Sequence, residues 1–522
     1  MDSSPDPTAT PARSTVAALL ERALARTPEA PAVIVDRGET LTYSQVSALS
    51  GALARRLVAA GIAPGRRVAV VAGRSAWQVI AAVAVLRAGG VYVPVDRSYP
   101  AARIAELLAD CAPDAVLHES CPEITQMAAM EAPAGVPTLD LGDPTIREDI
   151  HAEARAGNTG VTSARPITGE DPVYIIYTSG TTGKPKGAIN LHAGVALHLR
   201  WMGEVFGGEG HTVLNKAPMA FDVGVAEMLS PLVAGGTMVI PPHDWWPGDS
   251  RALLGMIHRH RVTVLSIVPS MVRAMLEAGV EAGEMDSLRH LLLGGEAVPA
   301  DLVARLREGT PARLHGLYGP SEAAMDVMWV EYTEEVPLRG GQALLGNAEP
   351  EVIVEVCRPE SREQVPPGEI GELIIGGPQV GGGYLRRPEA TAAAFFSGPD
   401  GQRRYRTGDL VRFDPALGMY EFRGRLGDQV KVRGNRVELG EVEAALRAAP
   451  GVRGAAARLV GEELWGYVTG ASQGNPVGLP AVRAHLEGAL PAYAVPTHLV
   501  PLDALPLSAN GKLDRRALPT QR

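Results

Sequence analysis

An apolar strand pattern runs directly into a glycine-rich turn in the stretch Val173-Tyr174-Ile175-Ile176-Tyr177-Thr178-Ser179-Gly180-Thr181-Thr182-Gly183-Lys184-Pro185-Lys186-Gly187. Its β-branched and aromatic start, residues 173–177, predicts a β-strand. A strand that enters such a turn presents backbone N–H groups to an anion, and lysines offset the anion's charge. The stretch therefore predicts a phosphate-binding loop, with hydroxyl donors, glycines and lysines at Thr178, Ser179, Gly180, Thr181, Thr182, Gly183, Lys184 and Lys186.

Two other interpretations of the turn account for its residues less well. Glycine, serine and threonine often make polar surface turns, but such a turn needs neither two lysines nor this many hydroxyls. The P-loop of nucleoside triphosphatases requires a glycine where Thr178 stands and a serine or threonine where Pro185 stands. The P-loop interpretation therefore fails at both positions.

Upstream of the loop, helical and strand patterns alternate. Residues 78–86 predict a helix, residues 91–95 a strand, and residues 102–108 a second helix. Strands that alternate with helices favour βαβ units and a parallel sheet. We therefore expect an α/β protein.

Length and charge restrict the architecture and the partners. A chain of 522 residues exceeds what one compact core accommodates, so at least two domains are expected. The formal net charge of −10 disfavours a nucleic-acid partner, because binding nucleic acid normally requires a basic surface.

The sequence predicts a cytoplasmic protein with no membrane partner. Residues 1–7 lack the basic and apolar regions of a signal peptide, and the cysteines are odd in number and lack metal-ligand spacing. The most apolar helical stretch, residues 77–86, is shorter than the ~20 residues that cross a bilayer. We expect it to be a buried helix.

Further motifs extend along the chain, from Leu41-Thr42-Tyr43 through Tyr318-Gly319-Pro320-Ser321-Glu322 and Tyr405-Arg406-Thr407-Gly408-Asp409-Leu410 to Asn510-Gly511-Lys512-Leu513. Together with the phosphate loop they resemble the adenylate-forming enzymes, the superfamily of acyl-CoA synthetases, luciferases and nonribosomal peptide synthetase adenylation domains. The resemblance covers nearly the whole chain. It implies an α/β fold with a large N-terminal domain of stacked sheets and helices and a small, mobile α+β C-terminal lid.

This resemblance implies a domain organisation. We expect a flexible tail at residues 1–13, an N-terminal domain with the ATP and amino-acid sites at residues 14–426, and the lid at residues 427–522. The lid should turn about Gly427 and Asp428. Relatives place the pivoting aspartate where Gly427 stands, and here the acid follows one position later.

The resemblance also implies ATP and Mg²⁺, and it assigns nucleotide contacts. Tyr318 would stack on adenine, Ser321 would contact phosphate, and Glu322 would bind Mg²⁺ through a hard oxygen. Asp409 would accept hydrogen bonds from both ribose hydroxyls, with Arg425 as a further contact.

Two more roles follow from the same motifs. Gly316 stands where relatives often carry an asparagine that reads adenine, so backbone carbonyls near Gly295 and Glu296 would take that part. Lys512 would be the catalytic residue. It would bridge the substrate carboxylate and ribose or α-phosphate oxygens, stabilising charge as pyrophosphate leaves.

The substrate is expected to be a small α-amino acid. Asp222 occupies the place where amino-acid-activating relatives pair an aspartate with the α-ammonium group, and a buried carboxylate needs such a cation. Aligning the motifs places the rest of the side-chain pocket at Val223, Ala226, Ser266, Leu292, Gly294, Leu317, Met325 and Asp326. The bulky members of this set shorten the pocket, so alanine, serine and glycine are the expected substrates. One methylene distinguishes such substrates by only about 1–3 kcal/mol.

The product would pass to the phosphopantetheine thiol of a separate carrier protein, because no carrier motif follows Lys512 in the sequence. The alternatives are an acyl-CoA synthetase, a D-alanine carrier-protein ligase, an enzyme for β-amino acids, and a nucleotide-sensing or scaffolding protein without the chemistry. An acyl-CoA synthetase predicts activity with acids that lack an amine. The last alternative fits poorly with the presence of Glu322, Asp409, Lys512 and both lysines of the phosphate loop.

Overall fold

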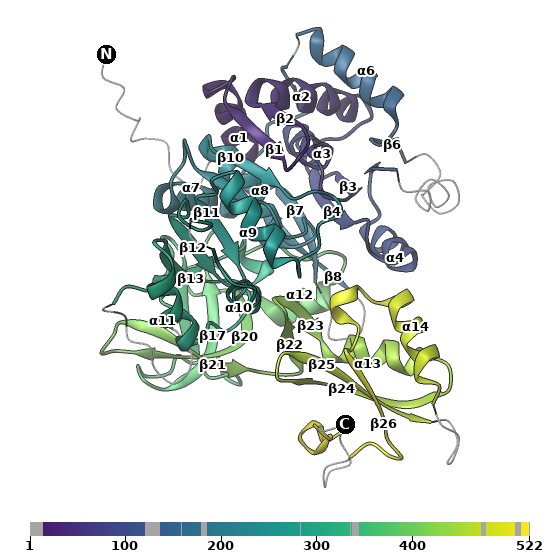
Figure 1. Ribbon diagram of the computed structural model, residues 1–522, viewed down its shortest axis with the longest axis vertical. Helices are drawn as coiled ribbons and strands as arrows, with labels where there is room; N and C mark the ends of the chain where they lie inside the picture. The colour runs from purple at the N-terminus through teal and green to yellow at the C-terminus, as the bar shows by residue number, and fades with distance from the viewer. Residues whose placement is uncertain are drawn as a thin grey trace. The chain divides into compact units, whose positions relative to one another are not determined.

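The computed structural model describes residues 14–120, 136–157, 159–178, 185–281, 283–334, 336, 344–470, 477–506 and 513–520. The chain divides into two compact units (Figure 1). The first comprises Met1–Asp96, Cys111–Ile176 and Gly187–Gly424. The second comprises Arg97–Asp110, Tyr177–Lys186 and Arg425–Arg522.

A seven-stranded sheet contains the strands on either side of the predicted phosphate loop. Its members are β3 (Arg67–Ala72), β4 (Val91–Asp96), β5 (Ala115–His118), β6 (Thr138–Asp140), β7 (Pro172–Thr178), β8 (Lys186–Leu191) and β18 (Gly383–Tyr384). They lie in the order β18-β8-β7-β4-β3-β5-β6, and β3 pairs in parallel with both β4 and β5. The predicted strands at residues 91–95 and 173–177 are confirmed as β4 and β7.

A nine-stranded sheet carries the second nucleotide motif. Its members are β1 (Pro31–Val35), β2 (Thr40–Thr42), β9 (Thr212–Leu214), β10 (Thr237–Ile240), β11 (Val264–Ile267), β12 (His290–Leu293), β13 (Arg313–Tyr318), β14 (Met328–Glu331) and β15 (Asn347–Ala348). Strands β11, β12 and β13 are parallel neighbours, so their carboxyl ends meet at one edge. In open α/β sheets, ligands bind outside such an edge.

A third sheet of the first unit is antiparallel and carries the ribose motif. It contains β16 (Ile353–Cys357), β17 (Ile370–Gly376), β19 (Phe395–Ser397), β20 (Arg403–Asp414) and β21 (Met419–Arg425). Strand β20 holds Asp409, whose side chain is buried.

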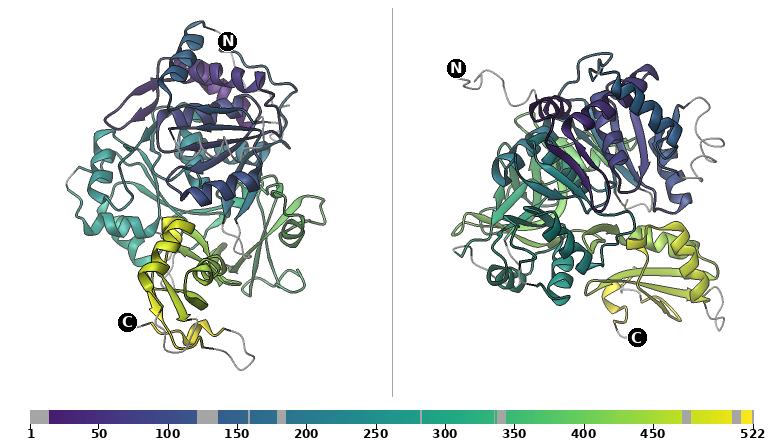
Figure 2. Two further views of the ribbon diagram at one scale, coloured as in Figure 1. Left: turned by 90° about the vertical axis from the view of Figure 1, so that its right-hand side faces the viewer. Right: turned by 45° about the horizontal axis from the view of Figure 1, so that its top comes forward.

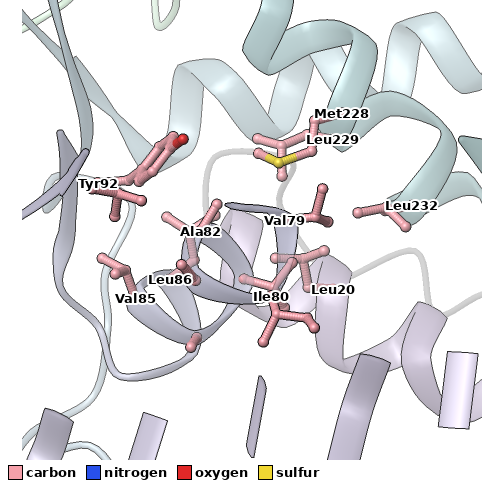
Figure 3. Close-up of a cluster of buried hydrophobic side chains, with 14 of the residues drawn as sticks. Leu20, Val79, Ile80, Ala82, Val85, Leu86, Tyr92, Met228, Leu229 and Leu232 are labelled. Atoms are coloured by element: carbon pink, nitrogen blue, oxygen red, sulfur yellow. The ribbon is translucent and has the colours of Figure 1, made fainter. Parts of the chain in front are cut away.

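Buried helices pack against these sheets. The helices of the first unit are α1 (Val16–Arg26), α2 (Tyr43–Ala59), α3 (Ala76–Arg87), α6 (Pro144–Arg155), α7 (His192–Phe206), α8 (Asp222–Ala234), α9 (Ser250–Arg259), α10 (Pro269–Glu277), α11 (Ala300–Gly309) and α12 (Pro388–Ala394). The predicted helix at residues 78–86 is confirmed as α3. All twelve of its residues are buried, as its apolar sequence requires. Figure 3 shows its side chains among Leu20 of α1 and Met228, Leu229 and Leu232 of α8.

The second unit has a small core of its own. Its sheets contain β22 (Gln429–Val432), β23 (Asn435–Glu438), β24 (Val452–Val460), β25 (Glu463–Gly470) and β26 (His498–Pro501), and its helices are α4 (Ala101–Cys111), α13 (Leu439–Ala448) and α14 (Leu479–Ala489). Helices α13 and α14 lie on one face of the three-stranded sheet (Figure 2), where Ala455 and Ala457 of β24 pack with Val442 and Leu446. Ala456 points to the other face, as strand alternation requires.

Both remaining expectations about secondary structure hold. The predicted helix at residues 102–108 is confirmed as α4, and the α/β class is confirmed by the parallel sheets and their helices. Among the residues described, no helix combines the length and the apolar character that a membrane span needs.

Candidate active site

The ends of the predicted phosphate loop are described. Thr178 ends β7, Lys186 begins β8, and these strands are neighbours in the sheet. The Thr178 hydroxyl donates a hydrogen bond to the Lys186 carbonyl at 3.4 Å. The other predicted phosphate ligands, Ser179, Gly180, Thr181, Thr182, Gly183 and Lys184, lie outside the described residues.

The second nucleotide motif forms a tight loop after β13. The Val327 N–H donates to the Tyr318 carbonyl at 2.8 Å, which closes the loop. A β-carbon at Gly319 would lie 1.8 Å from the Met325 carbonyl oxygen, so only glycine fits there. Ala324 and Met325 have φ of 54° and 81°, a left-handed conformation that is unfavourable for residues with side chains. Such strain often accompanies functional sites.

Three predicted site carboxylates each accept a hydrogen bond from a hydroxyl group. Ser321 donates to Asp222 at 2.5 Å, and Tyr318 donates to Asp409 at 2.5 Å. Tyr384 donates to Glu322 at 2.7 Å, where the Glu322 side chain is wholly buried. The fold therefore links the predicted amine-binding residue to the phosphate-contacting serine, and the predicted adenine-stacking residue to the ribose-binding aspartate.

Asn190 is a supporting residue that the sequence reasoning missed. It is fully buried on β8, and its side-chain amide donates to the Ser321 carbonyl at 2.8 Å. Its side-chain oxygen accepts from the Ala324 N–H at 3.0 Å. Asn190 thus holds both ends of the turn that contains Glu322. The only sequence signal was its place three residues after Gly187 of the phosphate loop.

Tyr384 was missed as well. It follows the glycine run at residues 381–383, which brings the backbone close to its neighbours. A β-carbon at Gly381 would lie 2.3 Å from the Ile189 carbonyl oxygen, and the Gly381 N–H donates to the Glu322 carbonyl at 2.9 Å. A glycine run before an aromatic residue could have indicated this close approach.

Asp222 is the first residue of α8 and is half-buried, whereas its sequence context predicted a buried carboxylate. Its carboxylate also accepts a hydrogen bond from the Val223 N–H at 2.7 Å, so the N-terminus of the helix stabilises its negative charge. Asn215 donates to the Gly224 carbonyl at 3.0 Å and fixes this helix end. A β-carbon at Gly224 would lie 2.2 Å from the Pro218 carbonyl oxygen, which explains the glycine.

The predicted side-chain pocket residues occupy several environments. Leu292 and Leu317 are buried in one cluster with Trp201, while Ala226 and Met325 are buried in the cluster that contains α3. Ser266 and Asp326 are half-buried, and Val223 is 37% exposed. A β-carbon at Gly294 would lie 3.0 Å from the Leu317 carbonyl oxygen, so this position accommodates little more than glycine.

Glu296, whose backbone is predicted to contact adenine, has a side chain that is already hydrogen-bonded within the protein. Its carboxylate accepts from the Ser270 N–H and hydroxyl, both at 2.9 Å, at the start of α10. Gly295 is exposed. A β-carbon at Gly316 would lie 2.2 Å from the Tyr332 hydroxyl oxygen, so an asparagine there would require Tyr332 to move.

Family models match most of the chain. The model described as AMP-binding enzyme matches residues 20–385, and the model described as AMP-binding enzyme C-terminal domain matches residues 441–512. The chain belongs to the AMP-binding enzyme family. The predicted membership of the adenylate-forming enzymes is confirmed by these matches, and the resemblance to nonribosomal peptide synthetase adenylation domains is confirmed by the relatives below.

Curated relatives of this AMP-binding enzyme are much longer proteins. Tyrocidine synthase 3 of Brevibacillus parabrevis is 37% identical over 96% of the chain, which spans 8% of that protein. Phosphinothricin tripeptide synthetase PhsB of Streptomyces viridochromogenes is 38% identical over 98% of the chain, which spans 42% of that protein. The chain thus covers less than half the length of these relatives.

Solved structures confirm the adenylate-forming enzyme fold. The chain resembles the amide bond synthetase McbA of Marinactinospora thermotolerans with a TM-score of 0.83 and 27% identity, covering 95% of this chain and 98% of that one. It also resembles PA1221, a nonribosomal peptide synthetase protein containing adenylation and PCP domains, with a TM-score of 0.79 and 27% identity. That match covers 97% of this chain and 84% of PA1221.

The predicted hinge residues of this AMP-binding enzyme belong to its second unit. Gly427 has a φ of 84°, which glycine adopts without strain. Asp428 Oδ1 lies 2.8 Å from Arg515 Nη1, and Arg515 also pairs with Glu443. Arg425 is half-buried, and Lys512 lies outside the described residues. The hinge, the domain bounds and the role of Lys512 stay predictions.

Proposed function

We propose that this AMP-binding enzyme activates a small α-amino acid, such as alanine, serine or glycine, with ATP. A carboxylate oxygen of the amino acid attacks the α-phosphorus, the bond to the bridging oxygen breaks, and pyrophosphate leaves as the aminoacyl adenylate forms. The preference for an amino acid rests on Asp222. This half-buried carboxylate accepts a hydrogen bond from Ser321, the residue before Glu322. The α-ammonium group of the substrate is the cation that matches this carboxylate.

In this proposal the hydrogen-bonded motif residues bind the nucleotide. Tyr318 stacks on adenine, and its hydroxyl keeps Asp409 in place to accept from the ribose hydroxyls. Lys512, proposed from its motif, supplies positive charge as pyrophosphate leaves. Positioning of the two reactants replaces the need for a nucleophilic side chain.

In this proposal a Mg²⁺ ion is held jointly by one protein carboxylate and the phosphates of ATP. Among the described ranges, no group of three or more His, Cys, Asp and Glu side chains is arranged to hold a metal. Magnesium often takes one or two protein carboxylates and completes its shell with water and substrate phosphates. Glu322 would provide such a carboxylate, and the ion would neutralise charge on the phosphates.

We further propose that the aminoacyl group passes to the phosphopantetheine thiol of a separate carrier protein. The thiol sulfur attacks the carbonyl carbon of the adenylate, and AMP leaves. Support comes from the resemblance to PA1221, whose adenylation domain shares a chain with a PCP domain.

Substrate-dependent pyrophosphate release tests this proposal. The purified protein is incubated with ATP, Mg²⁺ and a panel of L-, D- and β-amino acids, fatty acids and aryl acids. We expect turnover with small L-α-amino acids. Turnover confined to acids without an amine contradicts the role of Asp222 and indicates an acyl-CoA synthetase.

A further inference from the structure

A forked ion pair joins three distant segments of the second unit. Arg515 Nη2 lies 2.9 Å from Glu443 Oε1 on α13, and Arg515 Nη1 lies 2.8 Å from Asp428 Oδ1 at the predicted hinge. A guanidinium carries its donors in a rigid planar fork, so it holds two carboxylates in a fixed arrangement. These three residues, called the Arg515 brace below, connect the hinge, helix α13 and the C-terminal segment.

Glu443 attaches the Arg515 brace to the core of the second unit. Its side chain is 8% exposed, and its Oε1 also accepts a hydrogen bond from the Ala457 N–H of β24 at 3.0 Å. Ala457 packs with Val442 and Leu446 of α13 in this core. A buried carboxylate requires a cation and hydrogen-bond donors, and Arg515 supplies both. Arg515 is thereby fixed to the sheet and the helix of this unit.

Asp428 is tied to α13 through its backbone as well. Its carbonyl accepts a hydrogen bond from the N–H of Leu439, the first residue of α13, at 3.2 Å. Gln429, the next residue, pairs with Glu438 across β22 and β23. The Asp428 side chain is 57% exposed, and an ion pair this exposed adds little stability. Its ion pair in the brace therefore holds the predicted hinge acid in one orientation rather than adding stability.

Gly427, the preceding residue, has the freedom that Asp428 lacks. Its φ of 84° is one that glycine adopts without strain. A β-carbon at Gly427 would meet no atom of the described residues within 4 Å, so packing does not restrict the chain there. The chain can therefore turn at Gly427, whereas Asp428 moves with the second unit.

The Arg515 brace also reaches the two ends of the segment that contains Lys512. The Asp514 N–H donates to the Pro506 carbonyl at 2.9 Å, so residues on either side of this segment meet in a junction. Lys512 itself lies outside the described residues. Arg515, the residue after this junction, ties it to α13 and to the predicted hinge.

Apolar contacts hold the same junction against β25. Leu505 and Leu513 pack against the buried side chains of Trp465, Tyr467 and Leu518. Apolar attraction is non-directional, so these contacts keep the junction on the sheet without setting its orientation. The hydrogen bonds of a guanidinium with carboxylates are directional. The orientation of the junction therefore depends on the brace.

We propose that Arg515 is a positioning residue for carboxylate activation. It makes the hinge acid Asp428 and the junction beside Lys512 turn as one rigid body about Gly427. A charge that stabilises a transition state must be placed accurately, and a misplacement of about 1 Å can cost about 10²-fold in rate. Arg515 itself contacts neither nucleotide nor substrate in this assignment. The inference rests on the proposed function, because Arg515 acts through the charge of Lys512.

The kinetics of variants at two neighbouring arginines test this inference. Pyrophosphate release is measured with the acid that gives the highest turnover in the substrate panel. Arg515→Met is expected to lower kcat about tenfold and to leave KM for ATP and for the acid unchanged, because Asp222, Tyr318 and Asp409, which are predicted to bind them, lie in the first unit. Arg516→Met is the matched control, because Arg516 is exposed, and it should leave kcat unchanged. Unchanged kcat in Arg515→Met, or an equal loss in Arg516→Met, overturns the inference.

Two milder variants separate positioning from stability. Arg515→Lys should recover only part of the loss, because an ammonium is a single point charge and cannot fork between Asp428 and Glu443. Asp428→Asn removes only the exposed partner of the brace, so Tm should not fall, whereas kcat should fall about threefold. Unchanged kcat in Asp428→Asn, or a loss of kcat that follows a loss of Tm in these variants, overturns the inference.

A double variant tests whether Arg515 acts through Lys512. If it does, Arg515→Met causes no further loss of kcat in a Lys512→Ala background. A further loss of about tenfold in that background overturns the inference. Loss of kcat in Lys512→Ala without loss in Arg515→Met also overturns it and leaves the proposed function intact. Unaltered kcat in Lys512→Ala contradicts the proposed function as well.

Discussion

Two polar regions of the first unit differ in their hydrogen bonding: the motif carboxylates Asp222, Glu322 and Asp409, and the buried pair of His198 and Glu349. Asp222, Glu322 and Asp409 each accept from a hydroxyl at 2.5–2.7 Å. His198 and Glu349 share a hydrogen bond at 3.0 Å, and His198 Nε2 has no hydrogen-bond partner among the described residues. The first region is held in place by the protein itself. In the second region the two residues support each other's charge, because burial alone would lower the pKa of His198 but Glu349 raises it through its charge and hydrogen bond.

The largest loss of activity should follow from removing Lys512, the positive charge proposed to act on the reacting groups. Lys512→Ala is expected to lower kcat for pyrophosphate release by about 10²–10³, because it removes charge that stabilises the leaving group. Steady-state kinetics with the preferred amino acid measures this loss. Arg453→Ala, at an exposed cation of the second unit, is the control and should leave kcat unchanged. Unaltered kcat in Lys512→Ala would refute the mechanism.

The next largest effect should come from Asp222. Asp222→Ala is expected to lower kcat/KM for amino acids about 10–100-fold, because a charge-assisted hydrogen bond to the ammonium contributes about 1.5–3 kcal/mol. Asp244→Ala, at an exposed acid, is the control. If the variant activates amino acids as well as the native enzyme does, the Asp222–Ser321 hydrogen bond is structural and the amine binds elsewhere.

A smaller effect is expected from removing one of the hydroxyl groups that donate to the motif carboxylates. Tyr318→Phe keeps the aromatic ring but removes the donor to Asp409, so KM for ATP should rise about three- to tenfold. Tyr332→Phe is the matched control, since its hydroxyl donates to the Leu344 carbonyl at 3.1 Å. That variant should lose stability by about 1 kcal/mol without a change in KM. An unchanged KM in Tyr318→Phe would mean that Asp409 needs no help in binding ribose.

The smallest effect on activity at neutral pH should come from His192, a buried titratable group outside both regions. Burial lowers its pKa to about 4, below the ordinary 6.5, so the folded state favours the neutral ring. Its stabilisation is complete above about pH 6.5 and is lost as pH falls toward 4, by about 2 kcal/mol at pH 5. Denaturant unfolding at pH 7 and pH 5 measures the loss.

His192→Gln should weaken this pH dependence, whereas His243→Gln, at an exposed histidine, should not. Identical pH dependence in all three proteins would place the acid sensitivity in other groups. Residual sensitivity is expected from His290 and His315, whose pKa values burial also lowers to about 4.

Local patterns in the sequence were sufficient to predict several elements. The apolar run at residues 78–86 could only be a buried helix, and it is α3. The β-branched run at residues 173–177 is β7. Asp222, Glu322 and Asp409 were assigned their roles from short motifs that resemble those of the family, and these roles stay predictions. Such information is local, so it survives in the sequence without the fold.

Only the tertiary structure decided which groups meet. Tyr384 and Glu322 are 62 residues apart, Asn190 and Ser321 are 131 apart, and His198 and Glu349 are 151 apart. No periodicity links such positions, because their contacts depend on strand order and on glycines that allow backbones to approach. Burial disfavours the charged forms of both His198 and Glu349, and only the 3.0 Å hydrogen bond that the fold creates between them couples the two groups. The sequence by itself determined the chemical groups of the enzyme, and the fold determined their partners, their burial and hence their electrostatics.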